Sequence, residues 1–142
     1  DTFGGIEVLV NNASGAIWNK PFSELEWKDI QKHLDIQLQG AFNTCKSVLP
    51  FLEEQKYGKV INITSIYTDS TPPVNTYDYI LAKSALSSFT KSLAAEYGVK
   101  GICINNVSPG MTETTLIRNI PEKFTKNGIF YNTVNSIRDS KS

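Results

Sequence analysis

A tyrosine and a lysine stand four residues apart in the stretch "TYDYILAKSALSSFTKSL" of this 142-residue sequence. If the stretch is helical, Tyr79 and Lys83 project from the same face. A phenol with a pKa near ~10 exchanges protons slowly at neutral pH, but a neighbouring ammonium group favours the phenolate and lowers that pKa. The pair therefore predicts a general acid or base. The alternative is an exposed helix face without chemistry.

Two further polar sites follow apolar stretches. Ser65 ends "VINITS", and its hydroxyl could hydrogen-bond a substrate carbonyl oxygen and stabilise the charge that develops there. The alternative for Ser65 is a serine that caps a turn. The segment "NNASG" at residues 11–15 offers two amides and a glycine, where the backbone can approach a flat ligand closely. Its alternative is an ordinary turn, because Asn and Gly are turn residues.

The elements that must position these groups alternate along the chain. Three segments rich in β-branched residues, 7–11, 60–64 and 102–107, predict buried strands. Between the first two, apolar residues recur at steps of three and four, which predicts a long helix. A capping box of Ser23 and Glu26 is expected to begin it, and Pro50 to kink or thin its last turn.

A second helix is expected from about Tyr77 to Tyr97, with Gly98 as its C-terminal stop. The order strand, helix, strand, helix, strand predicts a parallel sheet with right-handed crossovers. In such sheets ligands bind at the carboxyl ends of the strands. The residues expected to form the functional site are therefore 11–15, 64–67 and 108–114. Residues 1–126 are expected to form one domain, and residues 127–142 a poorly patterned tail.

Composition excludes several classes of protein. Fourteen basic and 14 acidic residues cancel, so neither a nucleic-acid nor a membrane partner is expected. No apolar run approaches the ~18 residues of a membrane span and no leader is visible, so a cytoplasmic protein is expected. Cys45 and Cys103 are interpreted as buried apolar residues in a reducing compartment; the alternative is a disulfide or a metal pair, which no Cys-x-x-Cys motif or histidine partner supports. His33 has no companion spaced for a metal and is interpreted as a helix-surface residue.

Four stretches in order, "LVNNASG", "VINITS", "YILAK" and "NNVSPGMTET", resemble the short-chain dehydrogenase/reductase family. The resemblance runs from Phe3 to about Lys123. It implies an α/β fold: the central and C-terminal strands of a doubly wound, Rossmann-like parallel sheet in a three-layer α/β/α arrangement. It also implies a hydride transfer between NADP or NAD and a small carbonyl or alcohol substrate.

The resemblance assigns a role to each matched residue. Tyr79 would protonate the forming alkoxide, Lys83 would lower the pKa of Tyr79 and hold the nicotinamide ribose, and Ser65 would orient the carbonyl. The cofactor would be lined by Asn11, Asn12, Ala13 and Gly15, and at its nicotinamide end by Pro109, Gly110 and Thr114. The segment "MTETTLIRNIPEKF" resembles the substrate lid of 3-oxoacyl-[acyl-carrier-protein] reductases. Family members also pair through their two long helices, which implies a homo-oligomer.

The sequence also departs from the family pattern. Many members carry an Asn, three residues before a glycine, that supports a proton-relay water; here Gln37 stands in that position before Gly40. The interval from Ser65 to Tyr79 is one residue longer than usual. The family's Gly-rich phosphate loop is absent, so the chain is expected to be the middle of a dehydrogenase with an open edge strand at residues 7–11. The alternative function is a non-catalytic remnant or interaction module that cannot bind the cofactor by itself.

Overall fold

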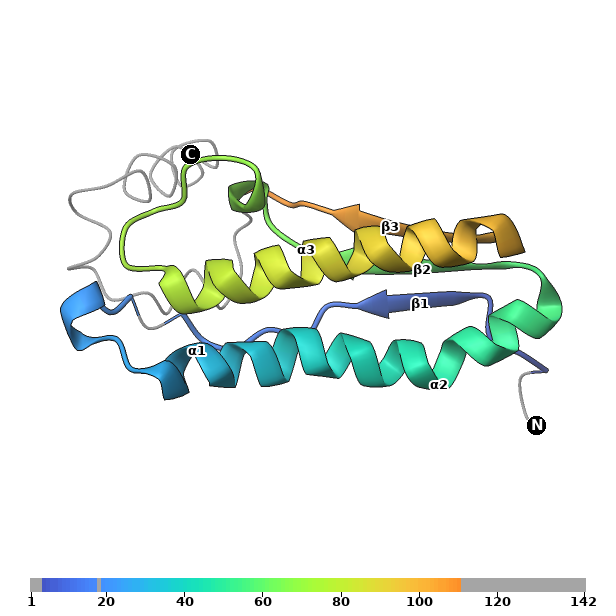
Figure 1. Ribbon diagram of the computed structural model, residues 1–142, viewed down its shortest axis with the longest axis horizontal. Helices are drawn as coiled ribbons and strands as arrows, with labels where there is room; N and C mark the ends of the chain where they lie inside the picture. The colour runs from blue at the N-terminus through green and yellow to red at the C-terminus, as the bar shows by residue number, and fades with distance from the viewer. Residues whose placement is uncertain (1–3, 18, 111–142) are drawn as a thin grey trace, which may run out of the picture.

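The computed structural model describes residues 4–17 and 19–110. Three strands, β1 (Val8–Asn11), β2 (Gly58–Ile63) and β3 (Ile102–Val107), form a parallel sheet in the order β1-β2-β3 (Figure 1). The register places Asn11 beside Asn62, and Asn62 beside Asn106. The parallel sheet predicted from the sequence is therefore confirmed, and all three strands end at one edge.

The first connection is a nearly continuous helical rod. It consists of α1 (Trp27–Leu34), a π-helical turn η2 (Asp35–Gln39) and α2 (Gly40–Gln55). Pro50 lies inside α2, and the helix continues beyond it to Gln55. The second connection is α3 (Tyr77–Tyr97). Short 3-10 turns complete the described elements: η1 (Phe22–Glu24), η3 (Ile66–Thr68) and η4 (Gly98–Lys100).

The capping box predicted for the start of the first helix involves the wrong residues. The N-cap is Glu26 rather than Ser23, and the capping box joins Glu26 to Asp29. The Asp29 carboxylate accepts a hydrogen bond from the Glu26 backbone nitrogen at 3.0 Å, while Lys20 holds the same carboxylate at 2.8 Å. The predicted pair, Ser23 and Glu26, and the observed pair, Glu26 and Asp29, have the same three-residue spacing. Ser23 cannot cap α1 because it lies within the separate turn η1.

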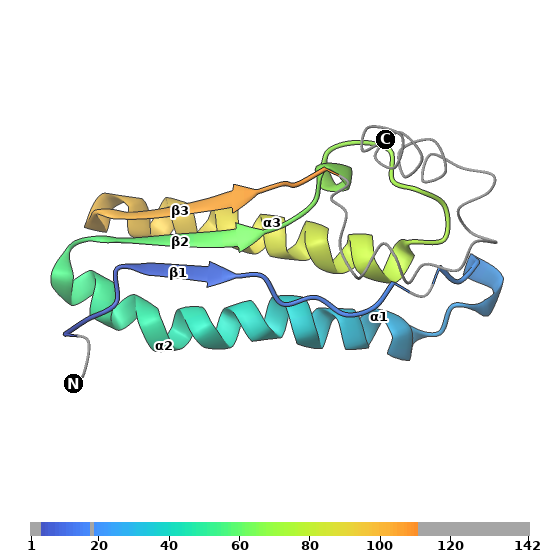
Figure 2. The same ribbon diagram turned by 180° about the vertical axis from the view of Figure 1, so that it is seen from behind.

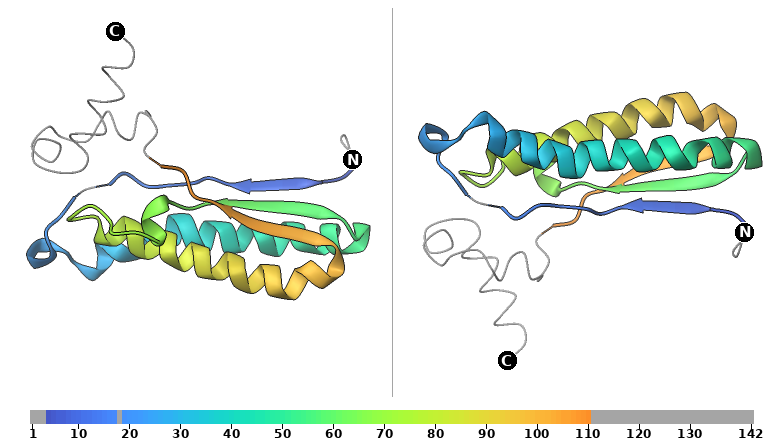
Figure 3. Two further views of the ribbon diagram at one scale, coloured as in Figure 1. Left: turned by 90° about the horizontal axis from the view of Figure 1, so that it is seen from above. Right: turned by 90° about the horizontal axis from the view of Figure 1, so that it is seen from below.

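The helices of the described residues all pack on one face of the sheet (Figure 3). A buried core joins the two layers: Cys45, Leu49, Leu52, Val60, Ile102 and Ile104. The other sheet face is not covered by any helix among residues 4–17 and 19–110 (Figure 2). Of the expected three-layer α/β/α arrangement, these residues therefore supply the sheet and one helical layer.

The uncovered face explains one wrong interpretation. Cys45 is buried, as expected, but Cys103 is exposed, because alternate residues of β3 point away from the helices. Val8 and Val10 of β1 are 49% and 53% exposed on the same face. Within the described chain β1 pairs only with β2, so the open edge expected at this strand is present.

Two glycines, Gly98 and Gly101, follow α3 and have different backbone conformations. Gly98 follows the last residue of α3, as predicted, but its φ of −59° is ordinary helical backbone. The reversal occurs at Gly101, which has a φ of +81°. A Cβ at Gly101 would lie 2.5 Å from the Lys56 carbonyl oxygen, whereas a Cβ at Gly98 would meet nothing within 4 Å.

Gly101→Ala is therefore expected to destabilise the chain by roughly 2–3 kcal/mol, since it adds both backbone strain and a clash with a backbone oxygen. Gly98→Ala is the matched control and is expected to be neutral or to stabilise by up to about 1 kcal/mol. Urea unfolding of the two variants measures the difference. Equal stabilities would contradict the assignment of the reversal to Gly101.

Candidate functional site

The candidate site lies where β2 ends and α3 begins. Ser65 lies two residues after the end of β2 and is the N-cap of η3, where its Oγ accepts a hydrogen bond from the Tyr67 backbone nitrogen at 3.3 Å. The turn-capping role left open by the sequence is thus real. Ser65 also hydrogen-bonds the Tyr79 side chain, so the structure brings together the serine and tyrosine that the sequence selected.

Tyr79 and Lys83 share one face at the start of α3. The Lys83 Nζ lies 5.7 Å from the centroid of the Tyr79 ring and donates a hydrogen bond to the Ile63 carbonyl oxygen at 2.6 Å. The ammonium group is thus held between the end of β2 and the phenol. Lys83 is only 3% exposed, and this burial lowers its pKa to about 8.

The expected pKa effect on Tyr79 was wrong in direction. Burial raises the pKa of Tyr79, and the hydrogen bond with Ser65 only partly opposes this increase. The reason is that removal of the phenolate from water outweighs nearby favourable contacts, while Lys83 directs its ammonium group to a backbone carbonyl. A phenol is protonated at neutral pH even without this increase, and the raised pKa favours the protonated form further, so Tyr79 holds a proton that it can donate.

The segment after β1 divides into a structural and an exposed part. The Asn11 amide donates to Asn62 Oδ1 at 2.8 Å and accepts from Thr44 Oγ1 at 2.7 Å, so its side chain joins β1 to β2 and α2. Asn12 and Ala13 are exposed, and Gly15 is half-buried. The exposed residues leave backbone at the sheet edge open to a ligand.

The segment after β3 lies beside the Ser65 turn. The Pro109 carbonyl oxygen accepts a hydrogen bond from the Ile66 backbone nitrogen at 3.2 Å, and Thr64 Oγ1 lies 2.8 Å from Ser108 Oγ. Gly110 is exposed at the end of the described chain. The expected cofactor residue Thr114 and the expected substrate lid lie outside the described residues.

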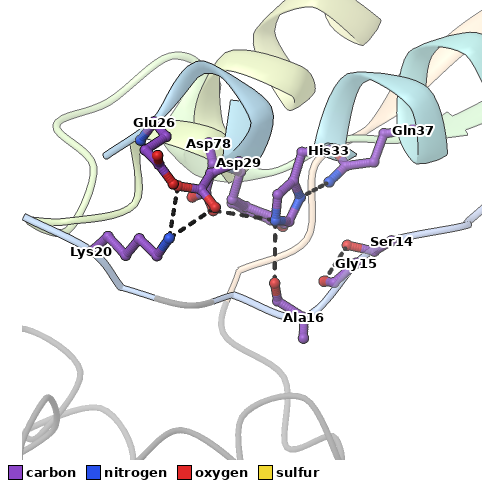
Figure 4. Close-up of polar contacts among 10 residues, drawn as sticks. Ser14, Gly15, Ala16, Lys20, Glu26, Asp29, His33, Gln37 and Asp78 are labelled. Carbon is purple, nitrogen blue, oxygen red and sulfur yellow. Dashed lines mark hydrogen bonds and ion pairs between the residues drawn. The ribbon is translucent and has the colours of Figure 1, made fainter. Parts of the chain in front are cut away.

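His33 was expected on the helix surface, but it belongs to a buried polar cluster. His33 is 1% exposed, not a surface residue, because the face of α1 that carries it packs against α3. Its Nε2 lies 3.2 Å from the Ala16 carbonyl oxygen and 3.4 Å from Asp78 Oδ2, and its Nδ1 lies 3.0 Å from Gln37 Nε2 (Figure 4). The four-residue interval between His33 and Gln37 was the available signal.

Gln37, expected in the catalytic group, is buried at 2% exposure. It contacts His33, whose ring lies edge-on to the Tyr79 ring with centroids 6.3 Å apart. Gln37 is therefore connected to Tyr79 only indirectly, by its contact with His33. Within the part of the chain that is described, no three His, Cys, Asp or Glu side chains are grouped to hold a metal, and no helix has the length and hydropathy to cross a membrane.

Comparison with known proteins defines the class. The model of the short chain dehydrogenase family matches residues 1–124, and the protein therefore belongs to that family. Oxidoreductase UcpA of Salmonella typhimurium is 35% identical over 120 residues, which cover 84% of this chain and 45% of UcpA. The 3-oxoacyl-[acyl-carrier-protein] reductase FabG of Vibrio cholerae is 33% identical, with coverages of 83% and 48%.

Solved structures agree with this membership. The structure of ElxO with NADP bound superposes with a TM-score of 0.77 at 31% identity, covering 82% of this chain and 47% of ElxO. NAD+-bound xylitol dehydrogenase superposes with a TM-score of 0.73 at 30% identity, with coverages of 82% and 45%. The chain thus spans about half the length of the relatives it matches.

Proposed function

We propose that this protein is an NAD(P)-dependent oxidoreductase that transfers a hydride between a nicotinamide cofactor and a small carbonyl or alcohol substrate. The observation that carries the proposal is the convergence of Ser65, Tyr79 and Lys83 at the carboxyl edge of the sheet. The family membership and the NADP- and NAD+-bound relatives support it.

Each of the three side chains has a task that its surroundings support. Tyr79 carries its phenolic proton at neutral pH, because a phenol pKa is high even in water and partial burial raises it further, so its hydroxyl can give a proton to the oxygen of a carbonyl substrate. Ser65, whose hydroxyl contacts Tyr79 in this structure, can turn its single O–H to the same substrate oxygen and fix its position. Lys83 supplies positive charge next to the phenol and can bind ribose hydroxyls through its remaining N–H groups.

The residues at the sheet edge fit a nicotinamide cofactor. Exposed backbone at Asn12 and Ala13 flanks the catalytic trio on the β1 side, and exposed Gly110 flanks it on the β3 side. When bound there, the cofactor supplies or receives the hydride. Together with Gly15 and Pro109, these residues and the trio are proposed to hold its nicotinamide half.

The substrate class proposed is a 3-oxoacyl thioester, which is the ketone reduced by relatives named 3-oxoacyl-[acyl-carrier-protein] reductase. The alternative is a non-catalytic module of the same fold. Titration with NADPH and NADH, followed by turnover with an acetoacetyl thioester, separates the two. It is run on this chain and on the longest natural form of the protein that contains it.

Micromolar cofactor binding with turnover that depends on Tyr79 supports the oxidoreductase. Absent or millimolar binding in every form, with no turnover, supports the non-catalytic module. Turnover of simple alcohols or sugars without turnover of the thioester would retain the oxidoreductase and refute the substrate class.

We also propose that two copies of the chain associate through α2 and α3. Between these helices lies a groove of about 290 Å³, and its residues mix apolar surface with charge: Phe42, Cys45, Lys46, Leu49, Pro50, Phe89, Leu93, Glu96 and Tyr97. Phe42 is 46% exposed, and its ring centroid lies 6.3 Å from that of Phe89. The exposed ring pair is suited to packing against its symmetry copy.

Phe42→Glu is expected to weaken self-association at least about tenfold, because it places a charge in an apolar contact. Phe51→Glu is the matched control, since Phe51 is 58% exposed on the same helix but outside the groove. Light scattering at tens of micromolar measures both. A monodisperse monomer for the unmodified chain, or equal effects of the two substitutions, would contradict this interface.

A further inference from the structure

The His33 ring joins three separate segments of the fold. Its Nε2 lies 3.2 Å from the Ala16 carbonyl oxygen, in the loop after β1, and 3.4 Å from Asp78 Oδ2 at the start of α3. Its Nδ1 lies 3.0 Å from the Gln37 amide nitrogen in the π-helical turn (Figure 4). The loop also packs directly on the ring, since a Cβ at Gly15 would lie 3.3 Å from His33 Cε1.

These partners define where the ring carries its proton. The Ala16 carbonyl and the Asp78 carboxylate are acceptors, so Nε2 must carry the hydrogen that faces them. The Gln37 amide nitrogen is a donor, so in this orientation of the amide Nδ1 is the acceptor. The arrangement corresponds to the imidazole tautomer with its proton on Nε2. With its nitrogen turned to His33, Gln37 leaves its buried Oε1 without a hydrogen-bond partner among the residues that the structure describes.

Asp78 connects this ring to the backbone of the tyrosine. One carboxylate oxygen faces His33, and the other accepts a hydrogen bond from the Tyr79 backbone nitrogen at 2.8 Å. Asp78 is 2% exposed, so water does not compete for either oxygen. The His33 ring also contacts the Tyr79 ring edge-on, with centroids 6.3 Å apart.

We propose that His33 is a positioning residue, which acts through Asp78 and through direct ring contact to fix Tyr79 relative to the loop at Ala16. The role of Tyr79 as the proton donor rests on the proposed function. None of the three side chains in this cluster, His33, Gln37 and Asp78, needs to touch the substrate. Their task is to keep the phenol, which sits on α3, at a constant place beside the exposed loop that follows β1.

The test uses the fact that His33 is the only histidine in the sequence. In a chain labelled with ¹⁵N-histidine, both ring nitrogen signals belong to His33 without further assignment. The expected spectrum at neutral pH shows a single neutral tautomer with the proton on Nε2 and slow exchange of that proton with water. A proton on Nδ1, or a rapidly averaging mixture of tautomers, would overturn the proposal.

Asp78→Asn breaks the connection with little change of shape. An asparagine side chain has one acceptor oxygen, so it can serve the Tyr79 backbone nitrogen or His33 but not both. We expect this variant to lose the single tautomer and to exchange the ring proton at least about tenfold faster, because the ring is no longer held on both sides. Asp35→Asn is the matched control, since Asp35 is exposed two residues from His33 and bonds Gln31 instead.

A second signal reports on the tyrosine itself. In a chain labelled at tyrosine Cζ, with the Tyr79 signal assigned through Tyr79→Phe, Asp78→Asn is expected to lower the pKa of Tyr79 toward its ordinary value as water reaches the phenol. The other groups that face this phenol, Ser65, Tyr67 and Lys83, are unchanged in the variant. A Tyr79 signal and pKa equal to those of Asp35→Asn would overturn the positioning role.

If Asp78→Asn does not fold, the same measurement of the Tyr79 signal is made on a second variant, His33→Gln. Neither signal requires turnover. An inactive protein with the expected His33 and Tyr79 signals would therefore refute the proposed function while supporting the positioning role. An active protein in which both variants leave the Tyr79 signal unchanged would refute the positioning role alone.

Discussion

Tyr79→Phe is expected to lower kcat by about 10²–10⁴-fold in the natural form of the protein that turns over substrate, while the affinity for NADPH changes little. The range is the usual contribution of a positioned general acid. The substitution removes one oxygen from a half-buried phenol and leaves the ring contact with His33. Steady-state oxidation of NADPH, followed at saturating cofactor, measures kcat.

Tyr77→Phe is the control, because Tyr77 lies on the same helix and is 44% exposed. Its expected kcat is within about twofold of the unmodified protein, as for surface substitutions generally. Equal kcat values for the two variants, or a Tyr79→Phe variant that retains more than about a tenth of the activity, would contradict the role of Tyr79 as proton donor.

Lys83→Met is expected to lower kcat/KM at least about 100-fold, because it removes the one buried cation that faces the phenol among the described residues. The unmodified protein should also show a pH dependence from this group. Burial lowers the pKa of Lys83 to about 8, so its positive charge is lost as the pH rises through that value. For carbonyl reduction kcat/KM should therefore fall above about pH 8.

The pH profile of Lys83→Arg provides the control, since a guanidinium stays charged over this range. This variant is expected to have a lower kcat/KM, because its planar head cannot repeat the ammonium contacts, but without the decrease above about pH 8. An unchanged decrease in Lys83→Arg would assign the titration to another group. Full activity of Lys83→Met would remove the residue from the mechanism.

The parallel sheet could be predicted because its strands are short, apolar and β-branched, and because helix-length segments separate them. The same reasoning placed Ser65, Tyr79 and Lys83 at one sheet edge, and the structure brings them together. The positions of these residues could be predicted because their spacing is fixed by one helix or by the end of one strand. Asn11, in contrast, has a side chain that bonds Asn62 and Thr44, which a linear sequence does not reveal.

The errors share a physical origin in tertiary burial. The pKa of Tyr79 was expected to fall because of Lys83, but desolvation of the phenol raises it. His33 was expected on the surface, but packing of α1 against α3 buries it among Ala16, Gln37 and Asp78. Cys103 was expected to be buried, but it is exposed, because alternate residues of β3 point away from the helices. None of these environments is determined by neighbours in sequence.

The central claim is that Tyr79 and Lys83 act beside a bound nicotinamide. A crystal structure of the longest natural form of the protein with NADP+ tests it most directly. We predict that ribose hydroxyls of the cofactor hydrogen-bond Lys83 Nζ, and that the nicotinamide ring lies within contact distance of the Tyr79 hydroxyl. A cofactor bound away from the carboxyl edge of the sheet, or a ribose that does not contact Lys83, would contradict the account.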